Sequence, residues 1–164
     1  MDKTNPYLPA PATILNVRQE TTSDTQDVKT YTLKCSVPLD FRPGQFLEVS
    51  VPGVGEAPFG FASSPLNRET LQLCIKRTGA VTDAIHGLRE GDTLWLRGPF
   101  GNSFPLEQFE GHDLFYAAGG LGLAPLRPMI DYIFHPAHRR KFGSVHMLVA
   151  ARSPRGFIFR YDYE

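Results

Sequence analysis

The sequence predicts a six-stranded antiparallel β-barrel followed by an incomplete α/β unit with parallel strands. Short runs of alternating apolar and polar residues recur up to about residue 98, a pattern typical of antiparallel strands with one buried face. A strand, a glycine turn and a helical segment then occupy residues 113–134, and a second apolar run spans 144–152. This order is typical of a β-α-β unit. We expect two domains, residues 1–108 and 109–164.

The composition indicates a globular chain of ordinary size. Its 164 residues are 41% hydrophobic, which is enough for a core. Seventeen Lys and Arg against 17 Asp and Glu give zero net charge, which argues against nucleic acid or an anionic membrane surface, because both need clustered positive charge. No apolar run has the length of a signal peptide or a membrane span. We therefore expect a cytoplasmic protein without a membrane span.

The expected barrel strands lie at 12–17, 28–36, 45–51, 58–64, 70–76 and 92–98. Glycine and proline mark the breaks between several of them, as turns require. Six strands over this length close more easily into a small barrel than they remain as an open sheet with exposed edges. Cys35 and Cys74 fall within strand patterns, so we interpret them as buried or half-buried thiols and not as a disulfide or metal pair.

One segment of the barrel half, residues 78–92, has a helical period. Val81, Ile85 and Leu88 fall on one side of the expected helix, with Thr82 as a candidate N-cap and Gly87 as a candidate stop. The residues before the helix leave unpaired N–H groups accessible, which favours phosphate binding. The alternative is a helical lid that covers one end of the barrel and binds nothing.

The second half is organised around the segment 117–130, AAGGLGLAPLRPMI. In a β-α-β unit, ligands bind beyond the carboxyl ends of the strands, here at the glycine turn 119–122 and at Arg152. The dinucleotide fingerprint G-x-G-x-x-G is not met, because Pro125 occupies the third glycine position. Arg152 stands where an acidic residue would hold a ribose, and it either faces a phosphate or caps the sheet. The turn itself either holds a dinucleotide or only connects a strand to a helix.

The order of these segments resembles the ferredoxin-NADP reductase superfamily. The likeness is carried by FRPGQFLEVSVPGVGEAPF, CIKRTGAVTDAIHGLREGD, LRGPFGNSFP and AAGGLGLAPLRPMI. Within the superfamily, these segments most resemble the electron-transfer (gamma or B) subunits of cytoplasmic hydrogenases, sulfhydrogenases and anaerobic sulfite reductases, and the related subunit of dihydroorotate dehydrogenase. The resemblance implies a barrel that binds FAD or FMN, a following domain that binds NAD(P)H, and a partner redox subunit that exchanges electrons with them.

Carried across, the resemblance implies three groups of cofactor-binding residues. The flavin segment is Phe59, Gly60, Phe61, Ala62, Ser63 and Ser64; the flavin phosphate segment is Ile75, Lys76, Arg77, Gly79, Ala80, Val81 and Thr82; the nicotinamide dinucleotide segment is Gly119, Gly120, Leu121, Gly122 and Arg152. We interpret Lys76 and Arg77 as facing the phosphates, where they offset a missing arginine. The alternatives are a barrel-mouth aromatic for Phe59 and a solvated strand end for Lys76 and Arg77.

The flavin segment departs from the family. The widespread form is Arg-Pro-Tyr-Ser, and this chain has Ala57, Pro58, Phe59 and Gly60. The guanidinium, the phenol and the hydroxyl are therefore all missing, and each is a polar contact worth about 0.5–1.5 kcal/mol, or up to about 3 kcal/mol where charge is involved.

The C-terminal half also departs from the family. Relatives continue through further strands and, in the hydrogenase and sulfite reductase branch, through a cysteine cluster for a [2Fe–2S] centre. Two distant cysteines cannot hold such a cluster, so we expect no iron–sulfur centre here. Two parallel strands and one helix leave a sheet face and an edge uncovered. The alternating tail 157–164 is expected as a strand, and either it covers the sheet or the chain is C-terminally truncated or part of a split protein.

The remaining features give few candidates for chemistry. The cluster His135, His138, Arg139, Arg140 and Lys141 is either a metal pair or, as we favour, a solvated loop. No side-chain nucleophile or acid–base pair is visible, and we name no catalytic or metal-binding residue. The leading hypothesis is a flavin-binding oxidoreductase subunit, since cofactors supply hydride chemistry themselves. The alternatives are a non-catalytic barrel that binds a partner subunit and, against the zero net charge, an oligonucleotide-binding barrel.

Overall fold

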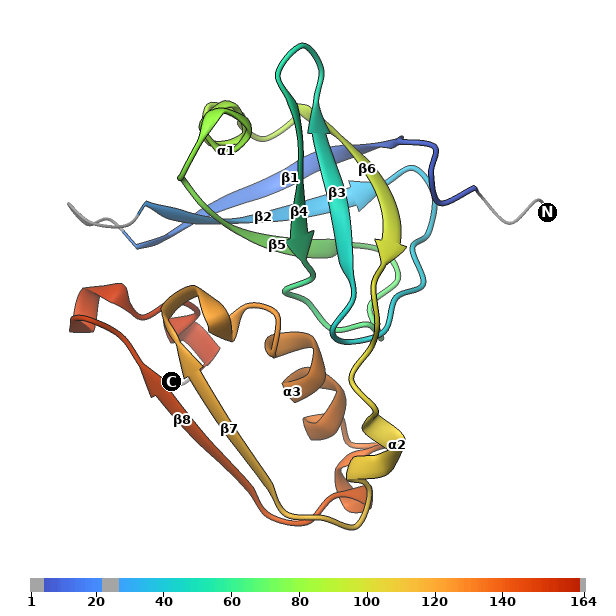
Figure 1. The fold of residues 1–164 in the computed structure, drawn as a ribbon, viewed down its shortest axis with the longest axis vertical. Coiled ribbons are helices and arrows are strands. Elements are labelled where there is room, and N and C mark those ends of the chain that lie inside the picture. The colour runs from blue at the N-terminus through green and yellow to red at the C-terminus, as the bar shows by residue number, and fades with distance from the viewer. Residues whose placement is uncertain (1–4, 22–26, 163–164) are drawn as a thin grey trace.

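The computed structural model describes residues 5–21 and 27–162 (Figure 1). Its first half is a six-stranded antiparallel sheet in the order β4-β3-β6-β1-β2-β5. The strands are β1 (Ala10–Thr21), β2 (Val28–Cys35), β3 (Phe46–Val51), β4 (Gly55–Gly60), β5 (Leu71–Lys76) and β6 (Thr93–Phe100). The two end strands meet through a bridge between Phe61 and Leu73, and Ala62 N–H donates to the Gln72 carbonyl at 2.8 Å. The sheet therefore closes, and the predicted six-stranded barrel is confirmed.

Alternation along the strands builds the barrel core. Tyr31, Leu33, Leu47 and Leu94 are each 0% exposed, as expected when every second side chain of a strand points inward. β4 begins and ends earlier than the predicted strand at 58–64. Phe61 follows it and stacks on Phe41 with ring centroids 3.6 Å apart, so the end of that predicted strand instead closes one end of the core.

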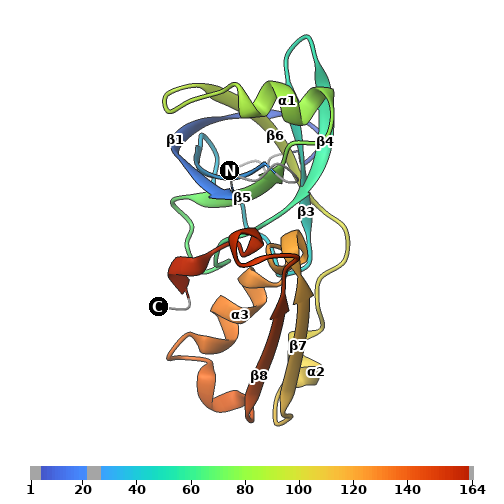
Figure 2. The same cartoon turned by 90° about the vertical axis from the view of Figure 1, so that its left-hand side faces the viewer.

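The helical segment forms α1 (Ala80–His86), which covers another end of the barrel (Figures 1 and 2). Ile85 is fully buried, and Val81 and Leu88 pack against the same core. Gly87 ends the helix as predicted. The predicted N-cap is wrong, because the helix begins one turn earlier and Thr82 lies inside it.

The second half is smaller. It contains α2 (Leu106–Phe109), β7 (Leu114–Gly119), the 3₁₀ turn η1 (Gly120–Leu123), α3 (Arg127–Phe134), η2 (Arg139–Lys141), β8 (Val145–Ala150), η3 (Pro154–Gly156) and η4 (Arg160–Asp162). β7 and β8 are parallel, which confirms the predicted α/β order. The carboxyl ends of both strands point toward the barrel (Figure 2).

Within the described residues, α3 covers one face of this two-stranded sheet. Tyr116 of β7 is buried in a cluster with Met129 and Ile133 of α3. On the opposite face Phe115 is 70% exposed and Leu148 is 58% exposed. The prediction of one uncovered face is confirmed. The apolar run 144–152, which on its composition is expected as a buried strand, is not buried: Val145 and Val149 of β8 are half-buried, Met147 is exposed, and the other side of the strand is open.

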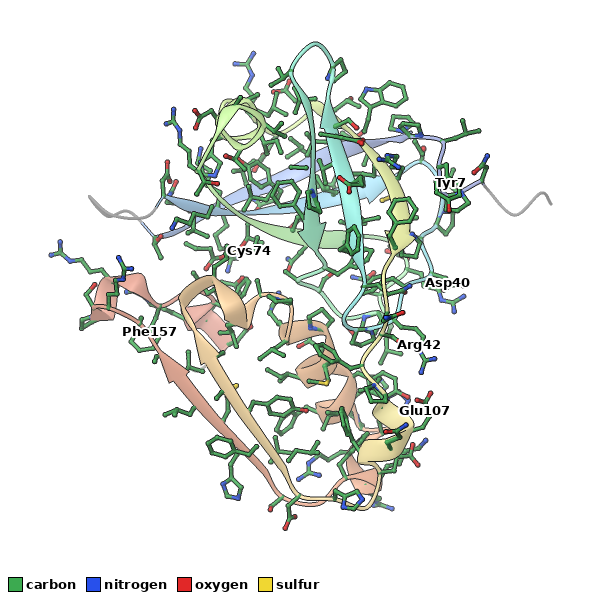
Figure 3. All side chains as sticks on the ribbon, in the orientation of Figure 1. Tyr7, Asp40, Arg42, Cys74, Glu107 and Phe157 are labelled. Carbon is green, nitrogen blue, oxygen red and sulfur yellow. The ribbon has the colours of Figure 1, made fainter. Side chains whose placement is uncertain are left out.

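The barrel and the α/β unit share an apolar interface. The buried residues of this interface are Val28, Ala62, Cys74, Ala118, Leu123, Ala124, Ile158 and Phe159. Cys74 lies on the side of β5 that faces the α/β unit (Figure 3). Cys74 is buried and Cys35 half-buried, and both are free thiols, as predicted. Arg42 of the barrel half forms an ion pair with Glu107 of α2, which links the two halves at a second point.

The tail 157–164 was predicted as a strand, but its described part, residues 157–162, contains the 3₁₀ turn η4 instead. Phe159 is fully buried in the interface, and its N–H donates to Glu20 Oε2 at 2.8 Å. In the described part of the tail, the Phe159 side chain packs between the two units, and no strand of the described residues pairs with this segment. Residues 163 and 164 of that prediction lie outside the described part.

Candidate functional site

A cleft of about 560 Å³ lies where the two units meet. It is bordered by the end of β5, the glycine turn after β7 and the segment after β8. The lining residues are Lys76, Gly119, Gly120, Leu121, Gly122, Ala150, Ala151, Arg152, Ser153 and Gly156. Its volume is within the usual range for a small-molecule site. Six residues that the sequence analysis assigned to two different cofactors thus border one hollow.

The glycine turn leaves its backbone open to that hollow. A Cβ built on Gly119, Gly120 or Gly122 would meet no atom within 4 Å. Gly120 has φ +51, in the left-handed region that favours glycine. A ligand can therefore approach this backbone more closely than side chains would allow, and the open turn fits a phosphorylated dinucleotide.

The two cations of the cleft come from different units. Lys76 ends β5 and is half-buried, whereas Arg152 follows β8 and is exposed. Two cations that border one cleft suit an anionic ligand, because charge-assisted hydrogen bonds to phosphate are stronger than neutral ones. Arg77, the next residue after Lys76, is directed elsewhere: its Nε donates to Asp83 Oδ1 at 2.8 Å. That hydrogen bond to Asp83 raises the pKa of Arg77.

At the start of α1, in the predicted phosphate segment, some backbone N–H groups already have a hydrogen-bond acceptor within the segment. Thr82 Oγ1 accepts hydrogen bonds from the N–H groups of Thr78 and Gly79, both at 2.8 Å. Ala80 is exposed, Val81 half-buried and Thr82 buried, while the Ile75 side chain is completely enclosed by the barrel core. A Cβ at Gly79 would meet nothing within 4 Å, so the space beside this backbone is open.

The flavin segment is the most enclosed of the three. Phe61 and Ala62 are buried, Ser63 is 8% exposed, and Phe59, Gly60 and Ser64 are intermediate. Ser63 Oγ accepts from Gln72 N–H at 2.9 Å, and Ser64 Oγ accepts from Leu66 N–H at 3.3 Å. The oxygen of each hydroxyl thus already accepts a hydrogen bond from a nearby backbone N–H. A flavin ring would meet the partly exposed Phe59 and backbone here, and not the side chains of Phe61 or Ala62.

Sequence reasoning missed one residue that joins these segments. Arg127, near the start of α3, donates from Nη1 to the Ala62 carbonyl at 2.7 Å. It therefore connects the flavin segment to the helix that follows the glycine turn. Its spacing from that turn gave no signal, because the contact depends on how the two units pack.

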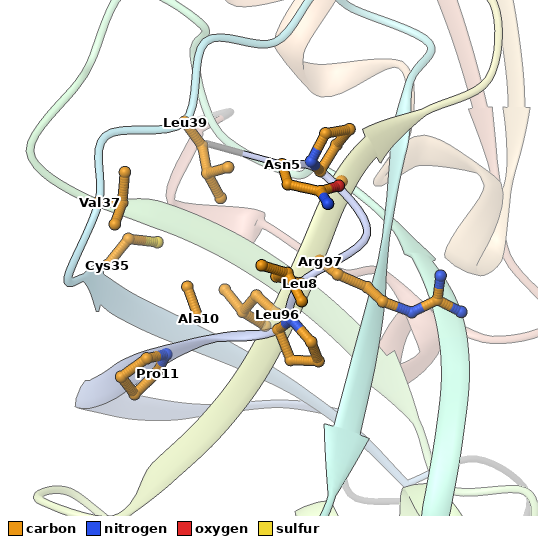
Figure 4. Close-up of a pocket in the computed structure, with 12 residues that line it drawn as sticks. Asn5, Leu8, Ala10, Pro11, Cys35, Val37, Leu39, Leu96 and Arg97 are labelled. Atoms are coloured by element: carbon orange, nitrogen blue, oxygen red, sulfur yellow. The ribbon is translucent and has the colours of Figure 1, made fainter. Parts of the chain in front are cut away.

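A second hollow, of about 410 Å³, contains none of the predicted site residues. It lies between the N-terminal segment before β1, the end of β2 and β6 (Figure 4), and its walls are mostly apolar. The guanidinium of Arg97 points away from it (Figure 4) and pairs with Glu56. Asn5, the other strongly polar side chain, accepts a hydrogen bond from Tyr7 N–H.

The histidine cluster has a structural role in the part of the chain that the structure describes. His138 stacks on Tyr132 with ring centroids 3.9 Å apart. No group of three or more His, Cys, Asp or Glu suited to a metal ion occurs among residues 5–21 and 27–162. The same ranges contain no helix long and apolar enough to cross a membrane.

A closed antiparallel barrel joined to a parallel α/β unit, with a cleft where the two units meet, is the arrangement of the ferredoxin reductase-like class. The family model described as "Oxidoreductase FAD-binding domain" matches residues 14–104. This match covers more than half of the chain, and the chain belongs to that family. The resemblance on which the sequence analysis relied is confirmed.

Within this class, the chain is similar to gamma and electron-transfer subunits of larger enzymes. Sulfhydrogenase 1 subunit gamma of Pyrococcus furiosus is 42% identical over 124 residues, which is 76% of this chain and 42% of the relative. Sulfhydrogenase 2 subunit gamma of the same organism is 37% identical over 161 residues, 95% of this chain and 53% of the relative. A probable dihydroorotate dehydrogenase B (NAD(+)) electron transfer subunit of Thermococcus kodakarensis is 34% identical over 128 residues, 78% of this chain and 48% of the relative. The chain thus spans about half the length of these relatives.

Solved structures support the fold. Ferredoxin-NADP+ reductase from Plasmodium falciparum, in a mutant form, superposes with a TM-score of 0.83 over 98% of this chain and 66% of that one, at 15% identity. A cytochrome P450 reductase from Amycolatopsis gives 0.77 over 95% of this chain and 47% of that one, at 26% identity. The likeness therefore extends beyond the barrel into the α/β unit.

Proposed function

We propose that this chain is a flavin-binding electron-transfer component that accepts electrons from NAD(P)H and passes them to a partner redox subunit of the hydrogenase or sulfur reductase type. The observation that carries the proposal is the shared cleft, where Lys76, the glycine turn and Arg152 border one hollow. The relatives are named as subunits of multi-subunit enzymes, which supports the proposal that a partner redox subunit receives the electrons. We also propose that the two domains divide at residue 108, within α2, and that the protein is cytoplasmic.

The proposed roles of this chain's residues are binding and orientation. The open backbone at 119–122 lets a dinucleotide lie close to the sheet end, while Lys76 and Arg152 hold its phosphates. The backbone from Gly79 to Thr82 receives the flavin phosphate, and Phe59 supports the ring. When bound, flavin and nicotinamide supply the hydride chemistry themselves.

The altered flavin segment favours one alternative, a non-catalytic barrel that binds a partner subunit. Ala57, Phe59 and Gly60 offer none of the three polar groups of the common family pattern. Under this alternative the cleft is a remnant of a site and no flavin binds.

Titration with FAD and with FMN separates the two readings. We expect a shifted flavin absorbance band and quenched fluorescence on addition of the protein. Spectra identical to those of free flavin, with a sample shown by circular dichroism to be folded, would contradict the proposal and support the alternative. Anaerobic addition of NADH then tests the second cofactor, and we expect poor bleaching because the α/β unit has only two strands among the described residues.

A further inference from the structure

Arg127 is the first residue of α3, the helix that follows the glycine turn, and its side chain extends to the barrel. Nη1 donates to the Ala62 carbonyl at 2.7 Å and to Gln72 Oε1 at 2.6 Å. Both acceptors belong to the barrel, on either side of the point where it closes. The side chain is only 14% exposed, so these bonds are largely shielded from water.

The other edge of the same guanidinium is held by the tail. Nε and Nη2 donate to the two oxygens of Asp162, at 2.7 and 3.2 Å, and the guanidinium carbon lies 4.6 Å from the centre of the Phe159 ring. Burial works against the charged form, but the hydrogen bond and the charge of Asp162 outweigh it, and the pKa of Arg127 is raised. Arg127 therefore remains a cation that joins three separate segments.

The acceptor on the barrel is part of the proposed flavin segment. Ala62 is fully buried and shares a cluster with Leu123 and Ala124, which follow the glycine turn. Gln72 holds the same segment through its backbone, accepting from Ala62 N–H at 2.8 Å and donating to Ser63 Oγ at 2.9 Å. A displacement of Arg127 would thus move the loop after β4 relative to the turn 119–122.

We propose that Arg127 is a positioning residue, which fixes the flavin segment 59–64 against the nicotinamide turn 119–122 so that the two cofactors face each other. This inference rests on the proposed function. It requires the planar guanidinium, which offers several donors in a fixed fork, and a lysine ammonium cannot reproduce that set of directions. Arg127 contacts neither cofactor in this proposal and acts through the Ala62 carbonyl.

The test compares Arg127→Met, Arg127→Lys and Arg18→Met in the full chain. Arg18 is the matched control, because its guanidinium also stacks on an aromatic ring, Tyr161 at 4.0 Å, but within the described residues it has no hydrogen bond to the flavin segment. We expect Arg127→Met to weaken FAD binding about tenfold, which is the effect of holding segment 59–64 in its binding-competent position in only about a tenth of the molecules. We also expect a changed vibronic shape of the bound-flavin absorbance band and faster hydrogen exchange at residues 61–64. Arg127→Lys should recover part of the affinity, and Arg18→Met should match the unsubstituted chain.

The possible outcomes distinguish a failure of this inference from a failure of the proposed function. If the unsubstituted chain binds no flavin, the proposed function fails and the role of Arg127 fails with it. If the unsubstituted chain binds FAD and Arg127→Met leaves affinity, band shape and exchange at the level of Arg18→Met, only the positioning role is refuted. Should Arg127→Met fail to fold, Arg127→Lys provides the second variant, since an ammonium cannot reproduce the contacts to Ala62, Gln72 and Asp162 together. Affinity, band shape and exchange equal to those of Arg18→Met in that variant would refute the role.

Discussion

Gly60, the last residue of β4, lies against Pro125, the proline that follows the glycine turn: a Cβ built on Gly60 would come within 3.3 Å of Pro125 Cβ. This distance is shorter than an ordinary carbon contact. The position where the family pattern has a serine is therefore filled, in this chain, by a residue of the other unit. The absence of the serine side chain at position 60 therefore allows the two units to pack closely at this point.

Restoring that serine is expected to disturb the interface. Gly60→Ser should lower stability by about 1 kcal/mol, at the low end of the cost of overpacking, which corresponds to about 2–4 °C in a chain of this size. Gly79→Ser is the matched control, because a Cβ there meets nothing within 4 Å and serine is a favourable residue before a helix. Thermal unfolding of both variants checks this. Equal melting temperatures for Gly60→Ser and the unsubstituted chain would show that the interface yields without cost.

Phe59→Tyr tests the missing phenol of the flavin segment. A single neutral hydrogen bond contributes about 0.5–1.5 kcal/mol, so we expect FAD to bind about 2–10 times more tightly. Fluorescence quenching measures the affinity directly. Phe115→Tyr, on the uncovered face of the small sheet, adds the same hydroxyl away from the cleft and should leave the affinity unchanged. A gain shared by both variants would mean that the hydroxyl acts non-specifically.

The cations of the cleft give a third prediction. Lys76→Met and Arg152→Met should each weaken binding of a phosphorylated cofactor about tenfold or more, because a charged hydrogen bond is worth about 1.5–3 kcal/mol. The affinity of the unsubstituted chain should also fall as salt rises, since both side chains are at least partly accessible to screening ions. Lys34→Met, an exposed lysine on β2, is the control. Calorimetric titration with FAD and with NADH assigns each cation to one cofactor, and no loss in either variant would remove the cleft from the proposed site.

The sequence was most informative where local pattern determines structure. Alternation predicted six barrel strands, five of them near their observed positions and the fourth displaced toward the C-terminus, and the Gly-rich step predicted the turn between β7 and α3. It was misleading at the tail, because Phe159 and Tyr161 alternate as strand residues do, yet the energy gained by burying Phe159 between two units exceeds what an unpaired strand could offer. Arg127 could not be predicted as a link, because its acceptor, Ala62, is 65 residues away and is brought to it only by the packing of the two units.

The two buried thiols predict how stability depends on alkaline pH. Burial raises the pKa of Cys35 to about 11 and that of Cys74 to about 12, whereas an unfolded cysteine titrates near about 8.5. Between these values the unfolded chain loses protons that the folded chain keeps, so the contribution of the two thiols to the free energy of unfolding should be constant from pH 7 to about 8 and fall as pH rises from about 8.5. Urea unfolding under reducing conditions, measured at intervals from pH 7 to 10, checks the slope.

The double variant Cys35→Ala/Cys74→Ala is the control: its curve should be flat up to about pH 9, because unfolded tyrosines, with a pKa near about 10, are still mostly protonated there. Above that pH a slope should return, because burial raises the pKa of Tyr31, Tyr116 and Tyr161 in the folded chain. A variant that retained the full slope between pH 8.5 and 10 would contradict the assignment of that slope to the thiols.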